Sequence, residues 1–432
     1  MPAPIIQVHV GWESLSGLVF RLDISTLDGV DVLDGLGVTD FSGTYDNVTH
    51  DTTDLRIRRG RSSKLENIQA GSCTFRLSRP QQPDFYNPNA PSGVAPIAGL
   101  DPGFAPMRPV RVQAVYGATT YPLFRGFIRS IEWDSASNQA TVEAVDLFLW
   151  LSRVRPTFTA EQAVLDGVTT TAAAIEYALN ESQWTDTDLI DMGTNVGDTL
   201  AASSFAAAEG ADSALSIIEG LLETERGIFY IQPDGSATFR HRNYRYTRDS
   251  VATFQSEILE VGSGIDLDRI VNRQAVTRTG GDTQTAEDLG LQSLYGISDG
   301  PAIDSAYLVD DAQADELARF VIGQRATPEA PASIVIDNDS EENLLRILTL
   351  DILDRITFPN QYDQFVFGTS RFGGSTALFG GGGSDYHVEA VELEVRAAGQ
   401  YVRARYTLSG RGQEYFRFGV SSFGGVDAAF AY

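Results

Sequence analysis

Lysine is almost absent from this sequence, which has Lys64 as its only example. A Walker A loop needs a lysine directly after its last glycine, and Lys64 follows Ser63, so P-loop phosphate chemistry is excluded. Cysteine is equally scarce, and the single Cys73 excludes an internal disulfide and a cysteine-rich metal site. No two of the four histidines have the i,i+4 spacing of a helical zinc motif, and we expect no metal and no cofactor. They are His9, His50, His241 and His387.

Long apolar runs are also missing. None approaches the ~20 residues that span a bilayer, and the first residues show no secretory signal. Positive charge is in short supply, with 32 basic and 58 acidic side chains and a net charge of −26. Such a surface is unsuited to gripping nucleic acid or anionic lipid. Low lysine with high aspartate fits a protein of a salt-loving organism, but a GC-rich coding sequence gives the same bias, and both interpretations stay open.

The 432 residues predict a mainly β fold with an α+β insertion. Alternating apolar and polar residues indicate a meander over 111–116, 123–134 and 139–145. Prolines and glycines make 80–109 a long loop or arm rather than a strand or helix. The predicted units are a first β domain (1–150, including this arm), a helical and hairpin middle domain (151–254), a second β domain with one helix (255–414) and a Phe/Gly-rich C-terminal segment (415–432).

The clearest hairpin joins the alternating runs that end near Ala397 and begin near Val402. A two-residue loop at Ala398-Gly399 places Glu394 opposite Arg403 and Glu392 opposite Arg405, which pairs opposite charges. A second hairpin is predicted over 228–240, around the turn Pro233-Asp234-Gly235-Ser236.

Three segments have helical periodicity. They are 169–180, the segment that begins at Asp212 and ends at Gly227, and 311–324. In the second of these, Leu215, Ile218 and Leu221 fall on one face.

The motifs that could carry catalysis or ion binding are weak. Gly296 to Gly300 matches the G-x-S-x-G elbow, but Pro301 follows where a helix is required, so a plain turn is favoured. Asp337 to Glu342 resembles the start of a calcium loop without its glycine, and it is more typical of a helix start capped by Ser340. Whether that loop binds an ion stays open.

Acids and aromatics also offer little. Asp186, Asp188 and Asp191 cannot be placed across a sugar by spacing alone, so a solvated acidic loop is favoured over a glycosidase pair. Trp12 and Trp184 are the only aromatic candidates for a receptor- or sugar-binding module.

Two basic clusters stand out from the acidic background. The first contains Arg56, Arg58, Arg59, Arg61 and Lys64. The second contains Arg240, His241, Arg242, Arg245 and Arg248, interleaved with Tyr244 and Tyr246. Basic residues among aromatics can bind single-stranded nucleic acid. We favour an acidic neighbouring subunit instead, because the summed charge of the chain repels phosphates.

A phenylalanine-rich segment occurs twice. Residues 365–379 recur at 416–430, with nine of fifteen positions identical. The plain interpretation is two strand–turn pieces packed on the chain's own core. We expect instead that the second copy contacts another chain, since exposed aromatics near a terminus are costly. Its assembly residues would be Phe416, Phe418, Phe423 and Phe430.

The order of segments resembles the baseplate-hub and tail-tip minor tail proteins of long-tailed, siphovirus-like phages. The resemblance rests on LRIRRGRSSKL at 55–65, QAGSCTFRL at 69–77, DFYNP at 84–88, and segments 109–112, 121–128 and 140–146. It covers most of residues 50–150 and is looser elsewhere, although 212–240 also looks like the group's middle domain. No matching motif is catalytic.

The resemblance implies a structural protein of the virion tail tip, made in the host cytoplasm, with two tail-tube-like β-barrels per chain. It implies a ring, a homotrimer, that closes or adapts the tail tube and lets the genome pass. The partners would be further copies, the tail tube, the distal tail protein, the tape measure and tip or fibre proteins, with DNA only in transit. A distal-tail or receptor- and glycan-binding tip protein is the alternative, and an enzyme acting on the cell wall is the weaker one.

Overall fold

The computed structural model describes most of the chain. The described residues are 3–11, 45–64, 66–81, 85–88, 104–182, 184, 189–194, 197–207, 212–254, 260–265, 267–325, 329–358, 384–396 and 400–410. Both copies of the phenylalanine-rich segment and Trp12 lie outside these residues, as does the middle of the proline-rich arm.

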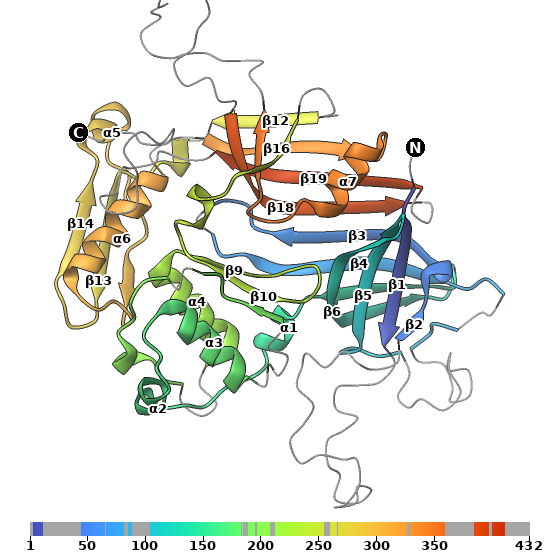
Figure 1. The fold of residues 1–432 in the computed structure, drawn as a ribbon, viewed down its shortest axis with the longest axis horizontal. Helices are drawn as coiled ribbons and strands as arrows, with labels where there is room; N and C mark the ends of the chain where they lie inside the picture. The colour runs from blue at the N-terminus through green and yellow to red at the C-terminus, as the bar shows by residue number, and fades with distance from the viewer. Residues whose placement is uncertain are drawn as a thin grey trace, which may run out of the picture.

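One sheet of 13 strands dominates the structure (Figure 1). Its main path runs in the order β12-β16-β19-β18-β3-β4-β7-β6-β5-β1-β2, and β11 and β17 join it beside β18. The strands are β1 (Ile5–Gly11), β2 (Tyr45–Asn47), β3 (Thr52–Gly60), β4 (Gln69–Ser78), β5 (Pro109–Tyr116), β6 (Thr119–Asp134), β7 (Gln139–Val145), β11 (Ser250–Thr253), β12 (Glu260–Ile265), β16 (Glu329–Asp337), β17 (Arg355–Phe358), β18 (Ser384–Arg396) and β19 (Tyr401–Gly410).

The two predicted β blocks share this sheet. Strand β3 pairs with β4 on one side and with β18 on the other, with Ile57 opposite Leu393. Both edges of β3 are therefore occupied, and the first block continues into the second instead of ending at its own boundary. The mainly β fold with an α+β insertion is confirmed, whereas no sheet of the described strands closes into a barrel.

The predicted hairpin registers are confirmed. Glu394 lies opposite Arg403 and Glu392 opposite Arg405 in the β18–β19 pair. The meander forms as β5, β6 and β7, paired in sequence order.

The middle of the chain contains four helices and a three-stranded sheet. The helices are α1 (Phe148–Leu151), α2 (Ala160–Leu165), α3 (Thr171–Glu181) and α4 (Ala214–Glu225), and the strands are β8 (Ile190–Asp191), β9 (Ile228–Ile231) and β10 (Ala237–Arg240). Helix α4 ends at Arg226, which takes the left-handed conformation with φ 55°. The predicted C-cap, Gly227, is needed for space instead, because a Cβ there would lie 2.7 Å from the Phe239 ring.

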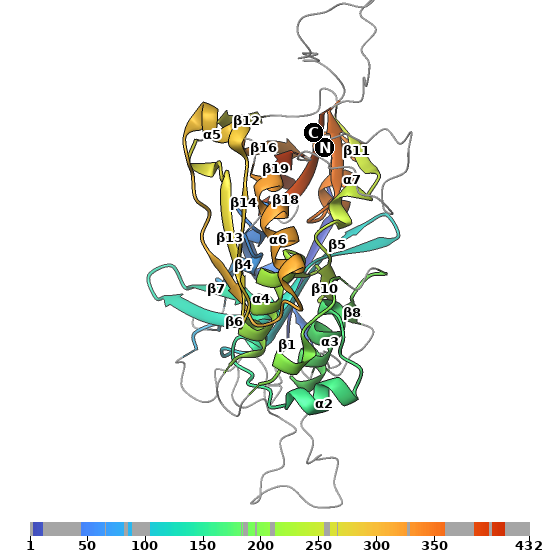
Figure 2. The same cartoon turned by 90° about the vertical axis from the view of Figure 1, so that its left-hand side faces the viewer.

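Residues 267–325 form a small α+β module with its own core (Figure 2). Its elements are β13 (Arg273–Arg278), β14 (Thr283–Glu287), α5 (Leu289–Tyr295), β15 (Ile303–Ser305) and α6 (Asp311–Gln324). Helix α6 matches its prediction and covers β13 and β14. Helices α5 and α7 (Glu341–Thr349) add to the one helix expected after residue 255.

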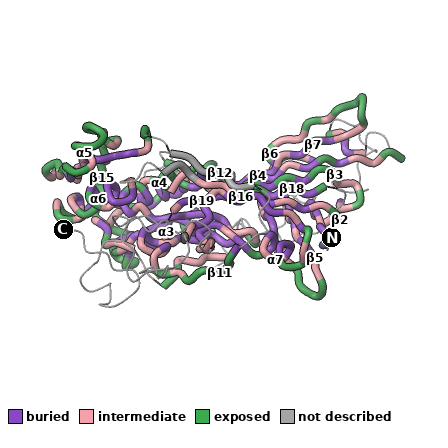
Figure 3. Tube along the Cα trace, turned by 90° about the horizontal axis from the view of Figure 1, so that it is seen from above, coloured by how far each residue is buried: buried purple, intermediate pink, exposed green. Residues whose placement is uncertain are grey.

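Side-chain caps start every described α-helix except α1. Each cap accepts a hydrogen bond from a backbone N–H in the first turn, which satisfies a donor that the helix leaves open. The caps are Thr159, Thr170, Ser213, Asp288, Asp310 and Ser340. Buried residues concentrate in the middle of the molecule, whereas the hairpin tips and α5 are exposed (Figure 3). Among the described helices, none is long and apolar enough to cross a membrane.

Candidate functional site

Strand β3 sends its arginines to opposite faces of the sheet. Leu55 and Ile57 are buried, and Arg59 continues their side of the strand and is only 7% exposed. Arg56 and Arg58 point the other way and are exposed. Alternation along a strand accounts for this split. The predicted first cluster is thus two groups with different environments.

The inward group continues past the strand to Arg61, which reaches a fully buried carboxylate. The Nε of Arg61 donates to an Oε of Glu389 at 2.6 Å. Arg245 donates to the other Oε at 3.1 Å, and the Ser409 hydroxyl also bonds to it. Glu389 is 0% exposed and lies at an irregularity in the β18–β19 ladder. We call Glu389, Arg61, Arg245 and Ser409 the buried node. It joins the first β block, the middle of the chain and the last two strands.

The node is held ionised by its own arginines. Burial alone would raise the pKa of Glu389, but the charges of Arg61 and Arg245 and the Ser409 hydrogen bond lower it well below its usual range. A permanently charged carboxylate between two guanidinium groups suits cohesion rather than proton transfer.

Most of the second basic cluster is internal. Arg240 pairs with Asp191, Arg242 with Asp198 and Glu316, and Arg248 with Asp354. Arg242 is 4% exposed and Arg245 5% exposed. These acids belong to the same chain, so the interpretation of this cluster as a contact for an acidic neighbour is wrong. Burial, followed by Arg242 and Arg240, lowers the pKa of His241 to about 4, which keeps that histidine neutral.

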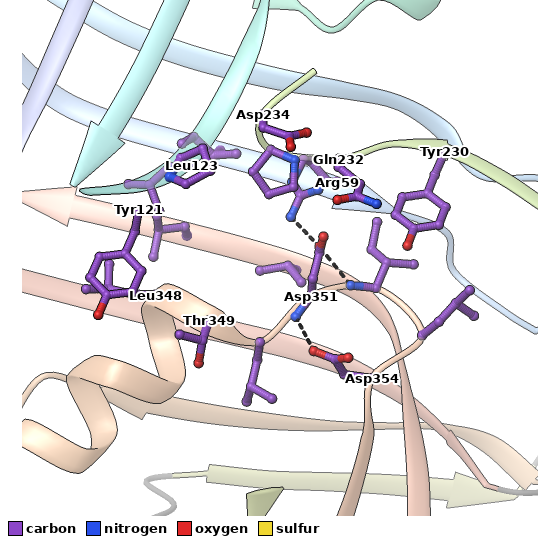
Figure 4. Close-up of a pocket in the computed structure, with 18 of the residues that line it drawn as sticks. Arg59, Tyr121, Leu123, Tyr230, Gln232, Asp234, Leu348, Thr349, Asp351 and Asp354 are labelled. Carbon is purple, nitrogen blue, oxygen red and sulfur yellow. Dashed lines mark hydrogen bonds and ion pairs between the residues drawn. The ribbon is translucent and has the colours of Figure 1, made fainter. Parts of the chain in front are cut away.

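A cavity of about 450 Å³ lies where the first β block, the β9–β10 turn and the loop after α7 meet (Figure 4). Arg59 and Asp351 point toward each other there and form an ion pair at 2.5 Å, with Tyr121 and Tyr230 on either side. The backbone N–H of Asp351 donates to the carboxylate of Asp354 at 2.8 Å.

The cavity carboxylates have partners within the chain. Burial raises the pKa of Asp354 to about 6, which is a range suited to proton transfer. However, the carboxylate of Asp354 already accepts from Arg248 and from the backbone. The cavity carboxylate of Asp234 accepts from the backbone N–H of Ser236. The arrangement therefore favours packing over acid–base catalysis.

The other motifs take structural roles. The Ser298 hydroxyl donates to the carbonyl of Ile270 in a segment without regular secondary structure, and no helix directly follows, so it is no nucleophile elbow. Ser340 caps α7, with Glu341 and Glu342 in the first turn. Trp184 is 1% exposed, so it cannot serve as an exposed binding aromatic.

Metal ligands and the remaining candidates add no site. Among the described residues, no group of three or more His, Cys, Asp or Glu side chains could hold a metal ion. Asp191 pairs with Arg240, whereas Asp186 and Asp188 lie outside the described residues. Lys64 lies in the turn after β3. Phe416, Phe418, Phe423 and Phe430 lie outside the described residues.

Glu389 was not predicted as a functional residue, although its position in the sequence carries a signal. Glu389 belongs to the same series of alternate strand positions as Val391, Leu393 and Val395, which are all buried. A carboxylate in the inward series of a strand needs a buried cation as partner. The same alternation places Arg59 and Arg61 inward with Leu55 and Ile57.

Comparison with solved structures identifies the fold. A tail protein from Neisseria meningitidis MC58 superposes with a TM-score of 0.54 and 9% identity, covering 94% of this chain and 96% of that one. The chain has the fold of phage tail proteins. The 43 kDa tail protein of prophage MuSo2 from Shewanella oneidensis matches with a TM-score of 0.51 and 10% identity, over 85% and 94% of the two chains. No protein-family model and no curated protein matches the sequence.

Proposed function

We propose that this chain is a structural subunit of the tail tip, in the baseplate hub of a long-tailed phage. The observation that carries the proposal is the agreement of fold with a tail protein over 94% of this chain and 96% of that one. Almost the whole of both chains takes part in the shared fold. The cavity supports the same role, because its charged residues are engaged in ion pairs and hydrogen bonds within the chain.

The hub would be a closed ring of copies, a homotrimer, through which the genome passes. The described sheet has open edges at β2 and β12, and open edges of large sheets are places where a neighbour can add. The net charge of −26 suits a channel wall that does not retain DNA phosphates. Neighbours in the tail would be the tube, the distal tail protein, the tape measure and the tip or fibre proteins.

Two groups of side chains are proposed for assembly. Of the first cluster, Arg56, Arg58 and Lys64 remain candidates, because Arg56 and Arg58 are exposed and Lys64 is half-buried, whereas Arg59 and Arg61 are buried. The second group is the C-terminal set that contains Phe416 and Phe430.

The location of the chain in virions tests the function. An internal epitope tag in the exposed turn at Gly117, followed by gold labelling and electron microscopy of particles, should place the chain at the tail tip on the tail axis. Label on the head, along the whole tail or only on lateral fibres would contradict a hub. A truncation that lacks residues 415–432 should fold and yet be missing from purified tails. Normal incorporation of this truncation would remove the C-terminal phenylalanines from the assembly surface.

A further inference from the structure

The outward face of β3, β18 and β19 collects positive charge on a strongly acidic chain. Its charged residues are Asp54, Arg56, Arg58, Glu392, Glu394, Arg396, Arg403 and Arg405. Five of these eight are arginines, whereas the whole chain has 32 basic and 58 acidic side chains. We call this surface the arginine face. Basic residues outnumber acidic ones on this face, whereas acidic residues outnumber basic ones in the whole chain.

Pairing of the strands fixes the rows of the arginine face. One row runs Arg58–Glu392–Arg405 across the three strands. The other runs Arg56–Glu394–Arg403 in the same order.

The opposite face of these strands belongs to the core. There Val391, Leu393 and Tyr406 are buried, and helix α7 covers β16 and β19 (Figure 1). The arginine face is thus the solvent-facing side of these strands, with a defined charge pattern.

The positive charge of this face is only partly neutralised. Glu394 accepts from Arg56 at 3.1 Å and from Arg396 at 2.6 Å. Arg58 is exposed and forms no ion pair with the described residues. Arg403 lies opposite Asp337 of β16, and its guanidinium lies over the Tyr401 ring. The exposed guanidinium of Arg58 is a site for an incoming acceptor.

We propose that the arginine face is the contact surface for an acid-rich surface of a second copy of this chain. Two like-charged copies approach most easily where one of them presents its cationic face to the acidic surface of the other. The contact is heterologous, with different surfaces on the two copies, and heterologous contacts generate rings. This inference rests on the proposed ring and names the surface that would build it.

Nucleic acid fits the arginine face less well than protein does. Glu392 and Glu394 lie in the middle of both rows, between the arginines. A phosphate backbone that followed the rows would meet a carboxylate at each central position. A protein surface can instead match alternating charges one by one.

Sedimentation velocity of the full chain across a salt series tests the proposal. The wild-type chain at tens of micromolar should associate at about 50 mM salt and dissociate toward about 1 M, because screening weakens exposed charge pairs. The double variant Arg58→Gln/Arg405→Gln should associate at least about tenfold more weakly. The matched control is Arg153→Gln/Arg319→Gln, which removes the same charge from exposed sites elsewhere and should stay within about twofold of wild type.

The single variant Arg58→Gln keeps the test decisive if the double variant unfolds, since Arg58 holds no described ion pair. A wild-type chain that is monomeric at every salt concentration overturns the inference, as does association that the variants leave unchanged. Retention of a 30-base-pair DNA duplex by the wild type but not by the variants assigns the face to nucleic acid and also overturns it. None of these results affects where the gold label lies in virions. The labelling experiment therefore tests the proposed function independently of this inference.

Discussion

Glu389 shows at the residue scale how this chain tolerates charge in its core. Its carboxylate is enclosed by Arg61, Arg245 and Ser409. Removing one member of a buried ion group leaves the other charges desolvated and unpaired, which costs more than the group contributes as a whole. Residues far apart in sequence therefore depend on one another at this point.

The first prediction concerns the Glu389→Gln variant. It should lower the free energy of unfolding by about 3 kcal/mol, because Arg61 and Arg245 remain charged and buried without a carboxylate. Urea denaturation followed by circular dichroism measures this. Glu392→Gln, on the exposed side of the same strand, is the control and should stay within about 0.5 kcal/mol of wild type. Equal effects of the two changes would show that the node contributes nothing special.

The second prediction is a pH dependence that arises at Glu225. Burial and the neighbouring Asp198 raise the pKa of Glu225 to about 7. Between about pH 4.5 and 7 the folded chain keeps this proton and the unfolded chain has lost it, so stability falls as pH rises through that window. The variant Glu225→Gln should flatten the slope whatever its absolute stability. Denaturation midpoints at half-unit pH steps check this, and an unchanged slope would count against Glu225 as its source.

At the scale of elements, local sequence patterns predicted the features that depend on neighbouring residues, such as hairpin register and helix position. The register of Glu394 with Arg403 follows from a short loop and alternating charge, and α6 follows from apolar spacing within one segment. The pairing of β3 with β18 joins residues more than 300 positions apart. Neither strand has a sequence pattern that specifies the other as its partner. The single sheet therefore could not be predicted from the sequence.

Gly60 allows β3 and β18 to approach closely enough for this long-range pairing. It has φ +112°, and a Cβ there would lie 2.2 Å from the carbonyl oxygen of Glu389. Any larger residue would push β3 away from β18 and from the buried node. The strand pairing thus depends on one glycine as well as on side-chain charge.

The third prediction compares two glycines with positive φ. Gly60→Ala should destabilise the chain by at least about 2 kcal/mol more than Gly117→Ala, because it adds a backbone clash to the strain of a left-handed conformation. Gly117 has φ +63° and open space around it, so its variant reports the strain alone. Thermal unfolding of both variants gives the difference. Equal losses would mean that β18 can move away from β3 at little cost.

At the scale of the whole molecule, cooperativity distinguishes one sheet from two separate β domains. The β3–β18 pair and the buried node tie the first and last blocks together, whereas module 267–325 has a core of its own. Its described contacts with the middle of the chain include the hydroxyl pair of Thr224 with Ser305 and the ion pair of Arg242 with Glu316. Because its core is separate from the main core, the module can open alone.

The fourth prediction follows from this arrangement and uses hydrogen exchange of the full chain in increasing denaturant. Amides of β3, β4, β18 and β19 should lose protection together, because unpairing β18 exposes an edge of β3 and uncovers Arg61. Amides of β13 and β14 should lose protection in a separate step. Glu389→Gln should shift the first step to lower denaturant and leave the second in place. If β4 and β7 instead exchange apart from β18 and β19, the blocks are independent domains and the shared sheet is only an adhesion of two folded units.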